Sequence, residues 1–218
     1  MSSPAIKAAA AIAAKSDPNP STLSWTEIVG AAEPFLNSVS QRLRQQISAF
    51  DSGIETYAEY ALTGQGKQLR PLLVALCAEA TGKPQDSHVT VAVIIEMVHL
   101  ATLVHDDVMD EADIRRGRRT LAANWGNEIA VLLGDCLFAH SLKLAASFPT
   151  PEICRAVAMA TNTVCSGEIL QNRHRGDFEF TLGEYFRVLE MKTAELFELS
   201  CELSAVLSGA PGEHRLAL

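Results

Sequence analysis

The apolar residues of this chain recur at helical spacing from Ser24 onward. Ser24 and Glu27 stand in the positions of a capping box, which predicts a helix that runs to about residue 50. Caps, first-turn prolines and trailing glycines predict further helices over residues 54–62, 69–81, 86–104, 127–148, from 152 onward, and 181–208. No stretch alternates apolar and polar residues for long enough to predict a strand. The pattern therefore predicts an all-α fold.

The segment over residues 89–104 differs from the other predicted helices because it is apolar on every side. A helix of this kind is typical of the centre of a domain. Polar residues such as Glu96 and His99 interrupt it, so no uninterrupted apolar run reaches the roughly 18–20 residues of a membrane span. We expect a buried core helix and no membrane span.

Composition narrows the class of protein. The chain has 218 residues, of which 48% are hydrophobic, and 18 Lys and Arg against 26 Asp and Glu give a net charge of −8. These values predict one folded domain over residues 23–218 behind an Ala-rich, flexible tail at residues 1–22. They disfavour nucleic-acid binding, which needs a basic field. Five scattered cysteines without a CxxC pair predict reduced thiols and a cytoplasmic location.

A dense acidic cluster begins where the apolar segment ends: Asp106, Asp107, Asp110, Glu111 and Asp113. At about 100° per residue the first three lie on one narrow face of a helix, where carboxylates repel one another. Mg²⁺ would remove this repulsion, since it prefers oxygen ligands and completes its shell with waters and substrate phosphates. The cluster predicts a Mg²⁺ site for a phosphorylated substrate. The alternative is an ordinary solvated acidic face.

Basic residues suited to phosphate lie on both sides of the acidic cluster. Arg115 and Arg116 follow it, either as a phosphate clamp or as local neutralisation of the acids. Lys67 and Arg70 follow a Gly-Gln-Gly sequence at the start of a predicted helix, which favours an anion site. His99 lies seven residues before the first aspartate, almost on the same stripe, and is either a phosphate donor or a core histidine.

Taken in order, these residues resemble the motifs of the trans-polyprenyl diphosphate synthases. The matching sequences are GKQLRP at 66–71, His99, DDVMD at 106–110, RRG at 115–117, GD at 134–135, GEILQ at 167–171 and KT at 192–193. The resemblance covers residues 35 to 210. It implies an isoprenoid synthase fold, with helices around a central cavity, that forms a homodimer.

The resemblance assigns the charged residues to two substrates. Three aspartates would hold Mg²⁺ against the diphosphate of an allylic substrate: Asp106, Asp107 and Asp110. Four residues would bind isopentenyl diphosphate: Lys67, Arg70, His99 and Arg116. The implied activity is the Mg²⁺-assisted condensation of these two substrates to a trans-polyprenyl diphosphate.

The remaining motif residues would surround the reacting carbon of the allylic substrate. Arg115 and Lys192 would face its diphosphate, and Gln171 and Thr193 would lie beside the developing carbocation. The reaction needs an apolar cavity, because the allylic cation must meet the second substrate before water does.

Ala101 and Thr102, one helical turn before the aspartates, bear on product length. In the family that the sequence resembles, bulky aromatic residues at these positions block the growing chain. Small residues here predict an open tunnel and a product longer than farnesyl diphosphate. The alternative is that both are ordinary packing residues.

The match departs from the family pattern at its end. The family carries a second aspartate-rich motif on a later helix, and no such motif occurs within residues 181–218. We expect the chain to stop before that motif, with the C-terminal part of the fold missing. It is then either a fragment or a truncated relative, and we assign the activity to the complete protein.

Three other classes of protein fit the sequence less well. A non-catalytic partner subunit of a heteromeric prenyl diphosphate synthase has no need of an intact first aspartate motif. A class I terpene cyclase has no need of the basic residues around Lys67. A metal phosphohydrolase, suggested by the sequence His105-Asp106, needs further histidines at suitable positions.

Overall fold

The computed structural model describes residues 24–63 and 66–217, so the flexible tail predicted for residues 1–22 lies outside the described residues. The chain divides into two compact units, residues 1–31 and residues 32–218. The described part of the first unit is the start of α2 (Trp25–Ile47). There the Ser24 backbone amide donates to the Glu27 carboxylate at 2.7 Å, and the Glu27 amide donates to the Ser24 hydroxyl at 3.3 Å. The predicted capping box is confirmed.

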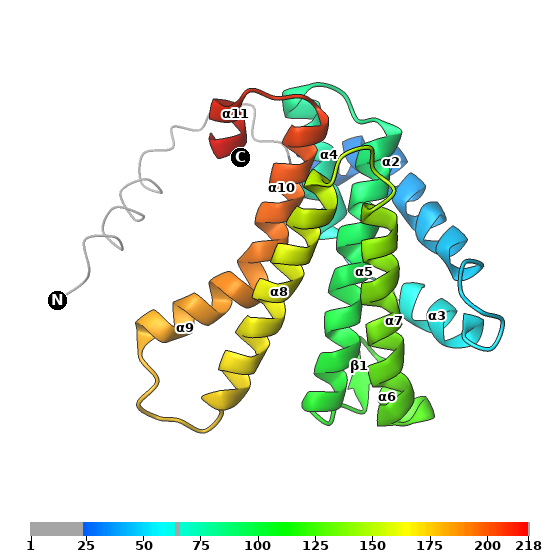
Figure 1. Cartoon of the computed structure of the whole chain (residues 1–218), viewed down its shortest axis with the longest axis vertical. Coiled ribbons are helices and arrows are strands. Elements are labelled where there is room, and N and C mark those ends of the chain that lie inside the picture. Colours follow the sequence, from blue (N-terminus) through cyan, green and yellow to red (C-terminus); the bar gives the residue numbers. More distant parts are fainter. Residues whose placement is uncertain (1–23, 64–65, 218) are drawn as a thin grey trace. The chain divides into compact units, whose positions relative to one another are not determined.

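The second unit is built almost entirely of helices in its described residues (Figure 1). After α2 the helices follow in chain order: α3 (Glu55–Leu62), α4 (Leu69–Thr81), α5 (Asp86–Met109), α6 (Leu121–Trp125), α7 (Asn127–Ala145), α8 (Glu152–Arg173), α9 (Leu182–Leu189), the π-helical turn η1 (Glu190–Ala194), α10 (Glu195–Leu207) and α11 (Gly212–Ala217). The all-α prediction is confirmed.

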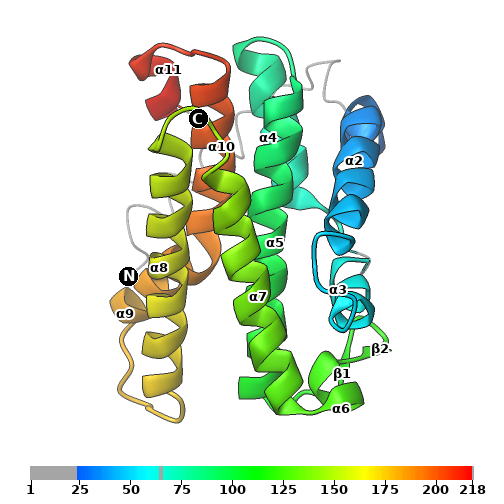
Figure 2. The ribbon, with the colours of Figure 1, turned by 45° about the vertical axis from the view of Figure 1, so that its right-hand side comes forward.

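Helix α5 is the core of this unit. Every residue from Val91 to Val98 is buried, and α7, α4 and α10 pack against the helix. Figure 2 shows α4, α5 and α7 side by side. Among the described helices α5 alone is long and apolar enough to cross a membrane, but 78% of its apolar segment is buried inside the protein. The prediction of a buried core helix is confirmed.

A short antiparallel hairpin follows α5, where the sequence predicted no strand. It pairs β1 (Ile114–Arg115) with β2 (Arg118–Arg119) around a two-residue turn. The turn residues Arg116 and Gly117 have φ of 51° and 76°, as a tight hairpin turn of the primed type requires. Glycine favours such angles and arginine does not, so the local sequence signal for the turn was weak.

The single helix predicted over residues 181–208 is in fact interrupted. It consists of α9, the π-helical turn η1 and α10. Here η1 packs closely against α8, and a Cβ on Gly167 would lie 2.8 Å from the Cβ of Met191. Hydrophobic periodicity does not distinguish a π-helical turn from α-helix, and the short helices α6 and α11 were also not predicted.

The close packing of α5 on α7 depends on Gly134. The His105 ring of α5 lies over this glycine, and its Nε2 is 3.0 Å from the Val131 carbonyl oxygen. A Cβ on residue 134 would lie 2.1 Å from that nitrogen. His105 is therefore a packing residue between two helices and does not point toward the aspartates that follow it.

We predict that Gly134→Ala lowers the free energy of unfolding by about 1–3 kcal/mol, because a methyl group must displace the His105 ring from a packed interface. Thermal and urea unfolding measure this loss. Gly30→Ala is the matched control: nothing lies within 4 Å of its added Cβ, and alanine is the better helix former. Equal stability of the two variants would contradict the packing role of Gly134.

Candidate active site

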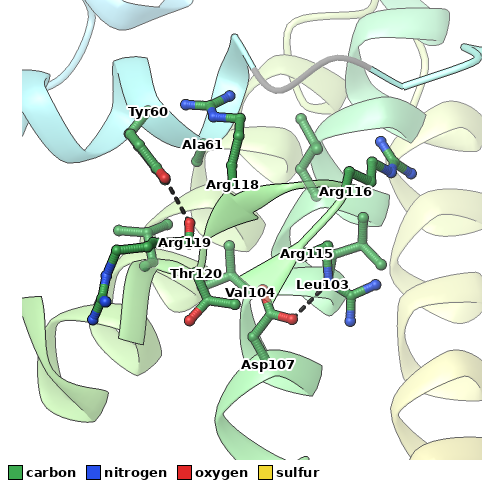
Figure 3. Close-up of a pocket in the computed structure, with 12 residues that line it drawn as sticks. Tyr60, Ala61, Leu103, Val104, Asp107, Arg115, Arg116, Arg118, Arg119 and Thr120 are labelled. Carbon is green, nitrogen blue, oxygen red and sulfur yellow. Dashed lines mark hydrogen bonds and ion pairs between the residues drawn. The ribbon is translucent and has the colours of Figure 1, made fainter. Parts of the chain in front are cut away.

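The three aspartates of the predicted metal site stand at the C-terminal end of α5 and have different partners. Asp107 is 6% exposed and its Oδ1 accepts a hydrogen bond from Arg115 Nε at 2.6 Å (Figure 3). Asp110, at the helix end, is exposed and accepts a hydrogen bond from Arg175 at 2.5 Å. Among the described residues no group of three or more His, Cys, Asp or Glu side chains is close enough to hold a metal ion. The aspartates thus share one helix end but do not converge.

Asp106, the third aspartate, belongs to a partly buried charged cluster with Glu168 of α8 and Lys192 of η1. Lys192 Nζ lies 2.5 Å from Glu168 Oε1 and 3.5 Å from Asp106 Oδ2. Burial raises the pKa of Asp106 and of Glu168, and the Lys192 ammonium opposes the rise. The single Lys192 ammonium group therefore pairs with two carboxylates.

The donor set of this cluster fits a hard divalent cation. Asp106 Oδ1 is buried and has no hydrogen-bond partner in the described part of the chain. A buried carboxylate oxygen without a partner is costly, and a cation ligated by oxygen atoms removes that cost. Asp106, Asp107 and Asp110 lie close together in the chain at one helix end, and their carboxylates are chemically suited to Mg²⁺. In this structure each of the three carboxylates pairs with a basic side chain.

Gln171 and Thr193 lie near this cluster along the chain. Gln171 is one helical turn beyond Glu168 on α8, and Thr193 follows Lys192 in η1; both are exposed. Because α8 packs against η1, the two residues belong to neighbouring segments.

A basic pocket of about 530 Å³ lies at the other end of the predicted stripe on α5. Its lining includes all four residues that the sequence grouped together: Lys67, Arg70, His99 and Arg116. Lys67 precedes α4, Arg70 stands in its first turn, His99 projects from α5, and Arg116 comes from the hairpin turn. Three separate chain segments thus form one basic pocket.

Glycine makes room for one of these cations. A Cβ on Gly66 would lie 2.6 Å from Arg116 Nη1, so a larger residue would displace the guanidinium. Another of these cations, Arg70, lies over the ring of Phe197, with its guanidinium carbon 4.7 Å from the ring centre. Arg70 Nε is buried and has no hydrogen-bond partner among the described residues.

His99 is an uncharged member of this pocket. Burial lowers its pKa to about 3, and the positive charges of Arg70, Arg116 and Arg115 contribute to the shift. The imidazole is therefore neutral near pH 7 and offers a hydrogen bond rather than a charge.

The hairpin that carries the arginines is anchored at both ends (Figure 3). The Tyr60 hydroxyl donates to the Arg119 carbonyl oxygen at 2.5 Å, and the Arg118 guanidinium lies 4.2 Å from the centre of the Tyr60 ring. Asp107 holds Arg115 at the other end. A cleft of about 110 Å³ lies between the hairpin, α3 and α5. Arg118 and Arg119 therefore fix the hairpin.

Ala101 and Thr102, the predicted length-controlling residues, differ in their surroundings. Ala101 is completely buried, whereas Thr102 is half-buried and its hydroxyl donates to the His99 carbonyl oxygen at 2.7 Å. Of the two, Thr102 has the space to take a larger side chain without rebuilding the core.

Three charged residues belong to the acidic cluster or to the basic pocket, although the sequence predicted no role for them. Glu168 lies inside a matched motif, Glu96 was noted only as an interruption of the apolar helix, and Arg175 follows α8 without a motif. A charged residue in an apolar helix is a signal that could have identified Glu96. The contact of Arg175 with Asp110 joins residues 65 positions apart and had no local signal.

Comparison with known proteins identifies the family of the chain. A sequence profile of the polyprenyl synthetase family matches residues 51–217. The chain is 36% identical over 180 residues to octaprenyl diphosphate synthase of Escherichia coli K12, covering 83% of this chain and 56% of that protein. It is 38% identical over 176 residues to heptaprenyl diphosphate synthase component 2 of Geobacillus stearothermophilus, covering 81% and 55%.

Solved structures are similar as well. A decaprenyl diphosphate synthase from Rhodobacter capsulatus superposes with a TM-score of 0.81 at 32% identity, covering 87% of this chain and 59% of that one. A polyprenyl synthase from Caulobacter crescentus, complexed with calcium and isoprenyl diphosphate, also gives 0.81 at 32% identity, covering 87% and 58%.

The helical fold described above thus has its counterpart in a known class of proteins. The chain belongs to the polyprenyl synthetase family. It spans 55–56% of the length of the two curated relatives described above.

The neutral state of His99 makes the stability of the protein depend on pH. An unfolded histidine, with a pKa of about 6.5, takes up a proton below that pH, whereas folded His99 stays neutral down to about 3. Between about pH 6.5 and 5 this difference should lower the free energy of unfolding by about 2 kcal/mol. Urea unfolding of wild type and His99→Gln at both pH values measures it.

The free energy of unfolding of His99→Gln should fall less than that of wild type between about pH 6.5 and 5. His214→Gln, at an exposed position, is the control and should behave as wild type. Parallel pH dependence in wild type and His99→Gln would show that His99 is not held neutral.

Proposed function

We propose that the full-length protein is a prenyltransferase that condenses isopentenyl diphosphate with an allylic diphosphate to a trans-polyprenyl diphosphate longer than farnesyl diphosphate. The observation that carries the proposal is the pair of charged sites on α5. His99 in the basic pocket and Asp106 in the acidic cluster are seven residues apart, about 10 Å along a helix. That separation suits two diphosphates bound side by side.

The acidic cluster is the proposed site of the allylic diphosphate. Asp106, Asp107 and Asp110 would hold Mg²⁺, which would stabilise the negative charge of the leaving diphosphate. Arg115 and Lys192, which neutralise aspartates in this structure, are positioned to donate hydrogen bonds to the same group. The calcium and isoprenyl diphosphate bound by the Caulobacter protein support a site for a divalent cation and a diphosphate.

The basic pocket is the proposed site of isopentenyl diphosphate, bound by Lys67, Arg70, His99 and Arg116. In the reaction the carbon–oxygen bond of the allylic diphosphate breaks and its electrons leave with the diphosphate. The allylic carbon then bonds to the terminal alkene carbon of isopentenyl diphosphate. A proton is lost to the departed diphosphate, which restores the double bond. Gln171 and Thr193 are proposed to stabilise the intermediate cation.

We further propose that the enzyme works in the cytoplasm as a homodimer. The five cysteines are free thiols, as in a reducing compartment. Exposed apolar residues on α7 and α8, among them Leu132 and Met159, support an interface with another protein chain.

A second candidate follows from the relatives named heptaprenyl diphosphate synthase component 2, from Geobacillus stearothermophilus and Bacillus subtilis. Such a name indicates a protein that works with another component. The protein would then be one subunit of a heteromeric synthase, and a non-catalytic subunit is the limiting case. The complete set of charged residues on α5 favours a catalytic role.

The test is an elongation assay with the full-length protein, labelled isopentenyl diphosphate, Mg²⁺ and primers from dimethylallyl to geranylgeranyl diphosphate. We expect elongated products and a loss of at least about 10³-fold in rate for Asp106→Asn, which removes the charge but retains the shape. The variant should fold normally, since it removes a buried carboxylate whose pKa is already raised.

Failure to elongate any primer, alone and with added partner components, would overturn the prenyltransferase proposal. Elongation only after a partner is added would support the heteromeric candidate. Full activity of Asp106→Asn would show that the metal does not depend on this residue.

Product length provides a separate prediction. Thr102→Phe should shorten the longest product by at least one isoprene unit, because a ring at this half-buried position obstructs the proposed tunnel. Thr102→Val, which keeps the size, is the control. Chromatographic sizing of the dephosphorylated products measures the change. If Thr102→Phe and Ala101→Phe are both active with unchanged products, the length control lies on another helix.

A further inference from the structure

The basic pocket contains a buried carboxylate that opposes its proposed ligand. Glu96 is 7% exposed and lines the pocket together with Arg70 and Arg116. It also lines an adjoining cavity of about 230 Å³, on the side of α2 and α3. A fixed negative charge here would repel a diphosphate, and water is too scarce at a buried position to screen it.

Charged and titratable groups face Glu96 from four segments. Lys67 and Arg70 come from the start of α4, Arg116 from the hairpin turn and Arg44 from α2 across the adjoining cavity. His99, one turn further along α5, completes the set. The Glu96 carboxylate therefore lies among the same cations that a diphosphate would bind.

Burial and the neighbouring arginines act on the pKa of Glu96 in opposite directions, and burial is the larger effect. Burial raises the pKa of Glu96, and the charges of Arg70 and Arg116 hold it down. A diphosphate bound to both arginines would offset their charge and add its own negative charge beside the carboxylate. Both changes favour the protonated acid.

We propose that Glu96 takes up one proton from solvent when a diphosphate enters the pocket and then donates a hydrogen bond to a diphosphate oxygen. The inference rests on the proposed function, because it concerns how the site for isopentenyl diphosphate accepts its ligand. The ionised carboxylate offsets part of the positive charge that lines the pocket, and the neutral acid serves as one more donor when the ligand is bound. The bound proton removes the repulsion.

Calorimetric titration of the full-length protein with isopentenyl diphosphate, without an allylic substrate, tests this role. Heats measured in buffers of different ionisation enthalpy give the number of protons taken up. The titrations run from about pH 6 to 9, so that they include conditions where the ligand's own phosphate, with a pKa of about 6, is ionised. Wild type, Glu96→Gln and the control Glu79→Gln, at an exposed position on α4, are compared.

At some pH in this range we expect wild type and Glu79→Gln to take up between half a proton and one proton more than Glu96→Gln. Affinity of wild type should fall by up to tenfold per pH unit above the pKa of Glu96. Glu96→Gln, which resembles the protonated acid, should show less pH dependence and bind more tightly than wild type at the highest pH. A merely structural role of Glu96 predicts weaker binding of Glu96→Gln at every pH.

The outcomes separate this inference from the proposed function. Absence of binding by wild type contradicts the anion site itself, and with it both proposals. If wild type and Glu96→Gln bind the ligand with the same proton uptake, only the role of Glu96 is contradicted. The same holds if the uptake is lost in His99→Gln but retained in Glu96→Gln, since His99 would then be the group that takes up the proton. Infrared difference spectra of wild type give a check that needs no variant, because ligand addition must produce a protonated carboxyl band.

Discussion

The burial of the middle of α5 is the constraint on which the other features depend. The helix is covered on all sides between Val91 and Val98, so every polar group along it must be matched by groups from neighbouring segments. Glu96 lies within this stretch, and His99, Asp106 and Asp107 follow it on the same helix. Their partners come from α4, the hairpin and η1, which brings distant parts of the chain to a single helix.

The structure balances these charges in two different ways. At the helix end each aspartate has a basic partner: Arg115 for Asp107, Arg175 for Asp110 and Lys192 for Asp106. In the basic pocket the cations outnumber the one carboxylate. An excess of positive charge in one place and of carboxylates in the other suits the two proposed ligands, a diphosphate and a metal-bound diphosphate.

Much of the helical fold was predictable because its signals are local. The boundaries of α4 coincide with the prediction, since a proline in its first turn and a glycine after its last turn mark them. The hairpin was missed because its turn places Arg116 at a positive φ, and η1 was missed because a π-helical turn has no distinct hydrophobic pattern. Both missed segments position charged residues of the candidate site, where local preference gives way to tertiary packing.

By itself the sequence determined the helical class and the buried core helix, because periodicity is a property of the chain. The order of its motifs, through the family that it resembles, also grouped Lys67, Arg70, His99 and Arg116, which line one pocket. The tertiary structure decided which group pairs with each charged side chain. Asp110 pairs with Arg175 and Lys192 bridges to Glu168 because α8 and η1 pack beside the end of α5. Such contacts depend on distances between separate segments, and no local pattern specifies those distances.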